Sequence, residues 1–356
     1  MKYYLSLLLA LFLVVGTLTA QKTVNMSAVK GNDFGVAYSL PKTSLTVYVY
    51  YTKTTKKAGE FYQYAERYLS MPNPITQDEV IYTIDGINAE TKGIVDKSKS
   101  YLVEFRSGSV ASFLTLTEDG VICAINDNYT FTPKLVFEPE QPNTALPDPR
   151  KFLSEEILRA GSSAKQAELI AKQIYRLRES RNSILTGEAD NMPPDGDAYK
   201  VVMSQLDEQE KALTSMFIGT EVQEKGMKEF TLVPDEKDID RKVIFRFSSK
   251  LGVVNPDDLS GAPVYLSLKN KEPKQEQFLT PKEEKEMEKK FSSGIIYNIP
   301  AKAILQITYN QKDYVKEEID VVQYGVQEVI SPKKLETKNP VKVIFYPETG
   351  AIKQML

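Results

Sequence analysis

The densest group of side chains able to ligate a cation or transfer a proton is an acidic segment near the middle of the chain. It contains Glu188, Asp190, Asp195 and Asp197. Such carboxylates suit Ca²⁺, but no register of the segment supplies the acidic, Gly and Glu positions of an EF-hand loop. We keep Glu188, Asp190 and Asp195 as weak binding candidates and expect no metal site. The favoured interpretation is helix capping, with Gly187 ending one helix and Asp195 or Asp197 beginning the next.

Three arginines before this segment have the chemistry to bind a phosphate or a carboxylate. They are Arg176, Arg178 and Arg181, and a guanidinium can grip either anion through paired hydrogen bonds. Because Glu179 lies among them, a solvated helix face is the favoured interpretation. Arg181 stays a candidate because it and Glu210 occupy positions where the helical period predicts apolar residues. Two such residues either meet partners in the helix seam or mark a surface contact.

Tyrosine is abundant, with 20 residues, and two of them suggest a sugar platform. Tyr48 and Tyr50 project from the same face of an expected strand at 45–51, as stacking against a sugar ring would require. Tyrosine is also a favoured strand residue, and the chain has no Trp. Carbohydrate binding through Tyr48 and Tyr50 is therefore the alternative function rather than the first.

Composition excludes several reaction classes. The 356 residues contain no His and a single Cys, Cys123. A Ser-His-Asp triad, a Cys-His pair and the common zinc clusters are therefore ruled out. A glycosidase with two carboxylates needs only Asp or Glu, but no spacing singles out a pair. We expect a protein that is not an enzyme and carries no cofactor.

A Ser-Lys hydrolase also survives the absence of His, because a lysine one helical turn after a serine can serve as its base. The spacing occurs at Ser27 and Lys30, Ser39 and Lys42, Ser162 and Lys165, and Ser331 and Lys334. Only Ser162 opens a predicted helix, where capping already explains a serine. The companion motifs Ser-Asp-Asn and Lys-Thr-Gly do not occur. Capping is the favoured interpretation.

The first 20 residues have the features of an export signal. One Lys precedes an apolar run, Leu5 to Val15, which is too short to span a bilayer, and small residues lead to Ala20. The residue directly after Ala20 is not a Cys, so a lipoprotein anchor is not expected. We expect export to the periplasm or cell envelope, with no transmembrane span in the mature chain.

Hydrophobic periodicity divides the rest of the chain into three parts. Residues 21–145 alternate with a period of two around one short helix, residues 150–219 repeat with a period near 3.6, and residues 220–356 return to strands around one charged helix. We predict a mainly β protein, α+β overall, with an αα-hairpin inserted between two sandwich-like β domains.

Local signals within these parts are more specific. Asp119-Gly120 stands between two alternating segments, which predicts a β-hairpin with a two-residue turn, and Cys123 shares the face of its apolar neighbours, which predicts a buried thiol. The spacing Ser163-Ala-Lys-Gln166 predicts the start of the first long helix. Its apolar residues and those of the second helix predict an antiparallel pair, packed through Ile170, Ile174 and Leu177 against Met203, Leu206 and Leu213.

Several short motifs spread over nearly the whole mature chain carry a family resemblance. They are Ser39–Thr43, Thr52–Thr54, Tyr64–Leu69, Arg181–Glu188, Asp195-Gly196, Leu206–Glu210, Gln323–Val326 and Tyr346–Gly350. As a set they resemble an exported family of Bacteroidetes proteins described only as a domain of unknown function. The resemblance implies export and the order β, helical hairpin, β. It implies no activity, ligand or site residue.

The formal net charge of −3, from 45 basic and 48 acidic residues, gives nothing that would attract nucleic acid. We therefore expect an exported envelope protein with a structural or interaction role, whose partner is an envelope protein or a glycan.

The signal segment gives a first testable prediction. The mature protein should begin at Gln21, because Ala20 is the small residue best placed after the apolar run. Intact-mass analysis of protein from the native envelope measures this directly. Retention of residues 1–20 on most molecules would show that the segment is an anchor instead.

Overall fold

The computed structural model describes residues 28–29, 36–103, 114–127, 146–190, 196–272, 280–291, 294–330 and 341–356. Three antiparallel sheets account for most of it, which confirms the mainly β, sandwich-like prediction. The candidate Asp195 lies outside the described residues.

The first sheet is a three-stranded ribbon with the order β3-β2-β6. Its strands are β2 Val36–Lys57, β3 Glu79–Val103 and β6 Thr220–Leu232. The second, which we call the cover sheet, has the order β11-β10-β9-β7-β8 and consists of β7 Ile239–Ser248, β8 Gly252–Val254, β9 Ala262–Asn270, β10 Ile295–Tyr309 and β11 Lys312–Ile330. The third, the end sheet, has the order β1-β4-β5-β12-β13 and consists of β1 Ala28–Val29, β4 Leu114–Leu116, β5 Ile122–Ile125, β12 Val343–Phe345 and β13 Ile352–Met355.

One pair of helices is long, with 24 and 22 residues, and the other helices have at most 11. They are η1 Tyr62–Tyr64, α2 Ala65–Leu69, η2 Pro149–Phe152, α3 Glu155–Leu158, α4 Ser163–Thr186, α5 Asp197–Ile218 and α6 Pro281–Phe291. Within the part of the chain that the structure describes, no helix combines the length and apolar character needed to cross a bilayer.

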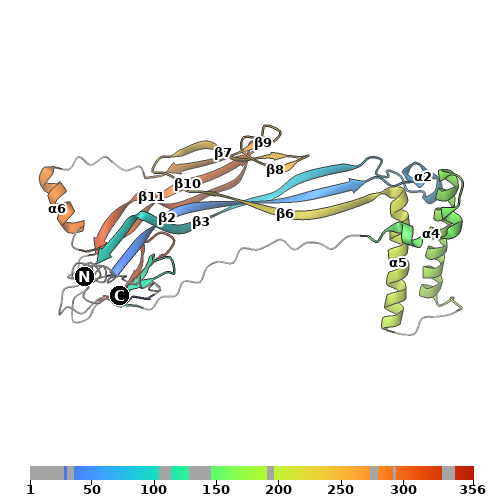
Figure 1. Cartoon of the computed structure of the whole chain (residues 1–356), viewed down its shortest axis with the longest axis horizontal. Coiled ribbons are helices and arrows are strands. Elements are labelled where there is room, and N and C mark those ends of the chain that lie inside the picture. Colours follow the sequence, from blue (N-terminus) through green and yellow to red (C-terminus); the bar gives the residue numbers. More distant parts are fainter. Residues whose placement is uncertain are drawn as a thin grey trace, which may run out of the picture.

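Figure 1 shows an elongated molecule with three parts. The cover sheet, the end sheet and the adjoining stretch of the ribbon form a base at one end. Helices α2, α4 and α5 form a head at the other end. Between them β2, β3 and β6 run alone, and we call this segment, residues 51–57, 79–85 and 220–226, the stalk.

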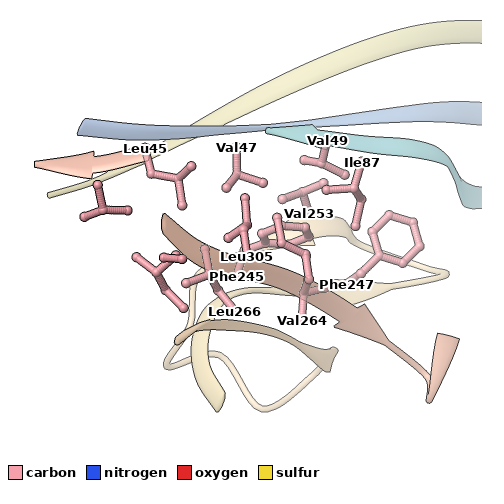
Figure 2. Close-up of a cluster of buried hydrophobic side chains, with 14 of the residues drawn as sticks. Leu45, Val47, Val49, Ile87, Phe245, Phe247, Val253, Val264, Leu266 and Leu305 are labelled. Carbon is pink, nitrogen blue, oxygen red and sulfur yellow. The ribbon is translucent and has the colours of Figure 1, made fainter. Parts of the chain in front are cut away.

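The main core of the base lies between the ribbon and the cover sheet. Leu45, Val47 and Val49 alternate along β2, and Figure 2 shows them pointing toward the cover sheet together with Ile87 of β3. The facing side chains include Phe245 of β7, and all five of these residues are at most 3% exposed. Burial of aliphatic side chains on this scale contributes about 1.5–3 kcal/mol per residue, which makes this interface the main stabilising contact of the base.

A second core joins the end sheet to the beginning of β2. The buried Tyr38 hydroxyl donates to the carbonyl oxygen of Ile296 at 3.1 Å, and the Ile296 N–H donates to the hydroxyl oxygen at 2.8 Å. The amide of Asn298 donates to the carbonyl oxygens of Pro41 at 3.0 Å and Thr349 at 2.9 Å. These long-range bonds connect β2, β10 and the turn between β12 and β13.

Pairing in the sheets crosses the boundaries that we expected between two β domains. In the end sheet β5 pairs with β12, and in the ribbon β2 pairs with β6. Residues 79–84 and 101–103 belong to the single strand β3. Polar residues and two glycines, Gly86 and Gly93, interrupt the apolar alternation of this edge strand without ending it.

The predicted hairpin at Asp119-Gly120 is present with a longer turn. The Thr117 N–H donates to the carbonyl oxygen of Val121 at 2.8 Å, so three residues rather than two lie in the loop. The Gly120 N–H donates to the Thr117 carbonyl oxygen at 2.9 Å, and Gly120 has φ 83°. This is a turn followed by a left-handed glycine, a combination that needs one more residue than a two-residue turn.

The head has its own core, and the predicted antiparallel helix pair is confirmed in its inner half. Ile170 and Ile174 of α4 and Leu213 of α5 are 0% exposed and belong to one cluster with α2 residues. Met203 and Leu206 are only half-buried, so the prediction that they share this core is wrong. Helix α4 begins one residue earlier than the capping spacing indicated, with Ser162 as its N-cap.

The stalk differs from both cores because most of its surface is uncovered; only Tyr51, Tyr82 and Ile84, at the end next to the base, pack against the main core. None of residues 51–57, 79–85 and 220–226 is buried. Polar cross-strand contacts hold it instead: Lys53 Nζ lies 2.7 Å from Glu224 Oε2, and the Thr52 hydroxyl donates to Asp85 Oδ2 at 2.7 Å. At about 3.3 Å per residue, the stalk spans about 20 Å.

The head core gives a second prediction. Ile174→Ala should lower the free energy of unfolding by about 2–4 kcal/mol, because it removes fully buried methylenes and leaves a cavity. Val201→Ala is the matched control, since Val201 of α5 is 61% exposed and should change stability by less than about 0.5 kcal/mol. Urea denaturation of both variants measures the difference. Equal, small effects would show that Ile174 is not part of a packed core.

Candidate functional site

The acidic segment does not form a site among the described residues. Glu188 and Asp190 are exposed just beyond Gly187, which caps α4 with φ 77°. Asp197 is the first residue of α5. The N-cap of this helix is Gly196, and no side chain caps its first turn through a hydrogen bond. Within the described ranges, no group of three or more Cys, Asp or Glu residues is arranged to hold a metal ion. Glycine capping at Gly187 is confirmed, whereas the N-cap role expected for Asp197 is wrong.

The two candidate tyrosines do not form an open platform. Tyr48 is 2% exposed and Tyr50 is half-buried. Lys92 of β3 covers Tyr48: its ammonium donates to the Tyr48 hydroxyl at 3.2 Å and lies 5.9 Å from the ring centroid. Stacking against a sugar needs a free ring face, and Tyr48 does not offer one.

Lys92 is a residue that sequence reasoning missed, and its protonation argues against a role as a general base. The hydrogen bond to Tyr48 raises the pKa of Lys92, with the carboxylates of Glu90 and Glu229 adding to the effect. A lysine held in its charged form cannot act as a general base. Only the antiparallel register of β2 and β3 brings Lys92 to Tyr48, and local periodicity does not reveal that register.

Arg181 and Glu210 do meet, in the seam between α4 and α5. Arg181 Nη1 lies 2.6 Å from Glu210 Oε2 and 3.5 Å from Asp207 Oδ1. Arg178 Nε donates to the other oxygen of Glu210 at 2.6 Å. The Glu210 side chain is 13% exposed, against 30% for Arg178 and 33% for Arg181. These four residues, the seam network, satisfy one another, and this explains charged residues at apolar positions of the helical period.

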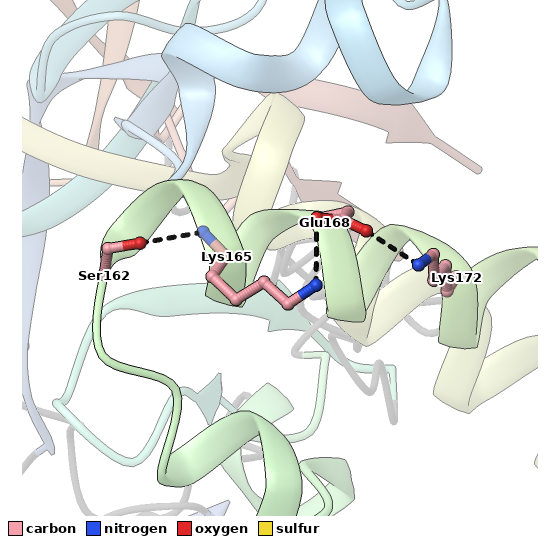
Figure 3. Close-up of polar contacts among 4 residues, drawn as sticks. All are labelled: Ser162, Lys165, Glu168 and Lys172. Carbon is pink, nitrogen blue, oxygen red and sulfur yellow. Dashed lines mark hydrogen bonds and ion pairs between the residues drawn. The ribbon is translucent and has the colours of Figure 1, made fainter.

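The Ser-x-x-Lys motif at the start of α4 is a helix cap rather than a dyad. Figure 3 shows that the Ser162 hydroxyl oxygen accepts from the backbone N–H of Lys165, at 3.3 Å. The Lys165 ammonium points instead to Glu168, with Nζ 3.2 Å from Oε2, and Lys172 binds the other oxygen of Glu168 at 2.7 Å. The serine therefore has no base, and the charges form a solvated helix face.

Cys123, the single thiol of the chain, is not placed to act as a nucleophile. It is 2% exposed, and burial raises the pKa of its thiol to about 11. A thiol protonated at neutral pH is a poor nucleophile, so the predicted buried, inert Cys123 is confirmed.

A shallow pocket lies in the head between η1, α3, α4 and α5. Its volume is about 200 Å³, and its apolar lining residues include Phe61, Ile157, Ile170 and Met216. Pockets for organic ligands usually measure roughly 300–1,000 Å³ and combine an apolar floor with convergent polar groups. This pocket is smaller, and its polar lining residues are Glu60, Arg150 and Gln166.

Comparisons with known proteins identify a family for this chain but no activity. A family model described as a domain of unknown function (DUF4831) matches residues 34–353. No curated protein and no solved structure matches the chain.

The seam network gives a third prediction. Glu210→Ala should lower the free energy of unfolding by about 1–3 kcal/mol, because two half-buried guanidinium groups lose their shared carboxylate. Glu168→Ala is the control: it also removes a carboxylate held by two cations in α4, but this site is exposed and the effect should be much smaller. The rate of hydrogen exchange at the backbone amides of α4 and α5 measures the stability of both variants. Similar protection in the two variants would contradict a stabilising role for the network.

The titrating groups give a fourth prediction, about pH. With no His, the melting temperature should stay nearly constant between about pH 6 and 8. It should fall in acid, because the hydrogen bond from Lys271 holds the pKa of Glu318 below its ordinary 4.5 and that stabilisation is lost as pH falls through the lowered value. It should also fall above about pH 9, since Cys123 ionises in the unfolded chain before it does in the folded one. Thermal scans at constant ionic strength test this. A shift above roughly 5 °C between pH 6 and 8 would reveal a strongly perturbed acid.

Proposed function

Because the chain belongs to the family described as a domain of unknown function (DUF4831), as its motifs indicated, we propose a role from its geometry rather than from a known relative. We propose that it is an exported protein of the cell envelope that acts through contacts, with the stalk holding the head away from the base as an interaction surface.

The observation that carries this proposal is the uncovered stalk between separate cores. The cluster of the head shares no residue with either cluster of the base. A strand segment without a buried face gains little from the hydrophobic effect, so the stalk adds separation rather than stability. A separation of this kind is useful for presenting one surface at a distance from another.

The distribution of chemical groups supports a contact role over catalysis. The charged side chains of the head pair with one another in the seam network and along α4. Exposed apolar side chains accompany them on the head, including Leu158 at 62%, Leu185 at 59% and Val201 at 61% exposure. These side chains lie on three different helices, and each offers an apolar contact to a partner of the head.

The amino-terminal segment supports the location. Its apolar run and the small residues up to Ala20 favour export, and the single Cys suits a protein that does not depend on disulfides. Envelope location is thus part of the proposal and is tested together with it.

A site-specific photo-crosslinker in the native envelope tests the role. Placed at Val201 in the head, it should give discrete products of higher mass, whereas placed at Thr83, which is exposed on the stalk, it should give only background. Both variants should fractionate with the envelope. Equal crosslinking at the two positions, or recovery of the chain in the cytoplasm, would overturn the proposal.

A further inference from the structure

Both edge strands of the ribbon are irregular at the point where the ribbon leaves the base. In β3, Gly86 lies opposite Tyr50, and the pairing then skips Asp85, which forms a β-bulge. In β6, Gly226 lies opposite Tyr51. A bulge disrupts the ladder locally and bends its strand, and glycine leaves the backbone freer than any other residue does. We call these five residues the junction.

The two faces of the junction differ. Gly86 lies on the outer face, because it is opposite Tyr50 and side chains alternate along β2 from Val49, which points to the cover sheet. A Cβ added to Gly86 would have no other atom within 4 Å, so this face is open. On the inner face the Tyr51 ring lies across Gly226, where an added Cβ would come within 2.6 Å of the ring atom Cε2. The junction therefore has room on one face only.

The cover sheet reaches past the junction on the inner face. Ser249 begins the turn between β7 and β8, and its carbonyl oxygen accepts from the backbone N–H of Tyr82 in the stalk at 2.7 Å. The Tyr82 ring packs so closely on Gly252 that an added Cβ would lie 2.8 Å from the ring atom Cδ1. We call Ser249, Gly252 and Tyr82 the clasp. Because Tyr82 lies farther along the stalk than Asp85, the clasp joins the base to the stalk beyond the bulge.

Strand β8, which carries one side of the clasp, is fixed to the base. Lys228 lies opposite Val49, on the base side of the junction, and its ammonium donates to the carbonyl oxygen of Val253 at 2.9 Å. Val253 is 6% exposed and belongs to the main core. Figure 2 shows it on the face of the ribbon toward which Val49 and Ile87 point. The β8 side of the clasp therefore belongs to the base, and the Tyr82 side belongs to the stalk.

At its other end the stalk is tied directly to the head core. The Phe61 N–H donates to the carbonyl oxygen of Met216 at 2.8 Å, and the Ile75 N–H donates to that of Ile218 at 2.9 Å. Gly59 has no space for a side chain, since an added Cβ would lie 2.6 Å from the Met216 carbonyl oxygen. Because backbone packs on backbone here, the stalk and the head move together, and bending falls to the junction.

We propose that the junction is a hinge and that the clasp is the latch which sets the direction of the head. With the clasp closed, the stalk is held against the cover sheet. With the clasp open, the ribbon bends at the junction toward its outer face, where Gly86 leaves room. One backbone hydrogen bond and one half-buried ring can open without unfolding either core. This inference goes beyond the proposed function, because it concerns the orientation of the head and applies whether or not the head has a partner.

Pulsed electron resonance between two spin labels on the full chain tests the latch. Cysteines that replace Arg176 in the head and Leu259 in the base are both exposed, and they can be labelled selectively because the native Cys123 is buried. With the clasp intact, the distribution of label distances should be narrow. Tyr82→Ala should broaden it about twofold, because the latch opens while the strand ladder stays paired. Thr83→Ala, at the exposed neighbouring residue on the opposite face, is the matched control and should leave the width unchanged.

A second substitution locates the hinge. Gly86→Val, added to Tyr82→Ala, places a β-branched side chain where there is space for it and stiffens the backbone, so it should remove at least about half of the broadening. Asn88→Val in the same background is the control, because Asn88 is exposed on the same face of β3 but lies on the base side of the junction. Circular dichroism checks that each variant stays folded. The proposal is overturned if Tyr82→Ala leaves the width unchanged, or if Asn88→Val narrows the distribution as much as Gly86→Val does.

Discussion

The hydrogen-bonded ladder between β2 and β3 is the constraint on which the rest of the structure depends. It runs from Val36 opposite Val103 to Lys56 opposite Glu79. One end of β2 packs in the end-sheet core through Tyr38, its middle packs on the cover sheet through Val47, and its far end enters the head. Antiparallel pairing satisfies the backbone whether or not a face is covered. Because backbone pairing does not depend on a buried face, β2 can pack in two cores and then continue as a solvent-exposed strand.

The junction between the ribbon and the cover sheet shows how the ladder is tied to its surroundings. At residues 322–325 β11 bulges out of register with β10 and reaches β2. There the Gln323 side chain accepts from the Thr43 N–H at 3.0 Å and donates to the Thr43 carbonyl oxygen at 2.7 Å, as a neighbouring strand would. Tyr324, which is 1% exposed, donates to the Lys237 carbonyl oxygen at 3.0 Å. A side-chain amide thus replaces backbone pairing where two sheets diverge.

Signals local in the sequence predicted local structure well. Gly187 ends α4 as expected. Gly219 ends α5 in the same way, and a capping box precedes α6, with the Thr280 N–H donating to Glu283 Oε2 at 2.7 Å. The pairing of Lys57 with Thr220 could not be predicted, because periodicity reports which face of a strand is buried and not which distant strand lies beside it. For the same reason the sequence left two interpretations of Arg181 open. It also suggested that Tyr48 is accessible, because it does not show that Lys92 lies against this ring.

The stalk also has a mechanical consequence. Its three strands run along the line that joins base and head, and their hydrogen bonds lie across that line. A tensile force that separates head from base would therefore stretch the three strands side by side instead of pulling their hydrogen bonds apart one after another. The chain leaves the base on β2, returns on β3 and returns again on β6, so tension is shared among strands that are covalently continuous with both ends. This geometry makes the segment with the least hydrophobic burial the one best arranged to resist extension.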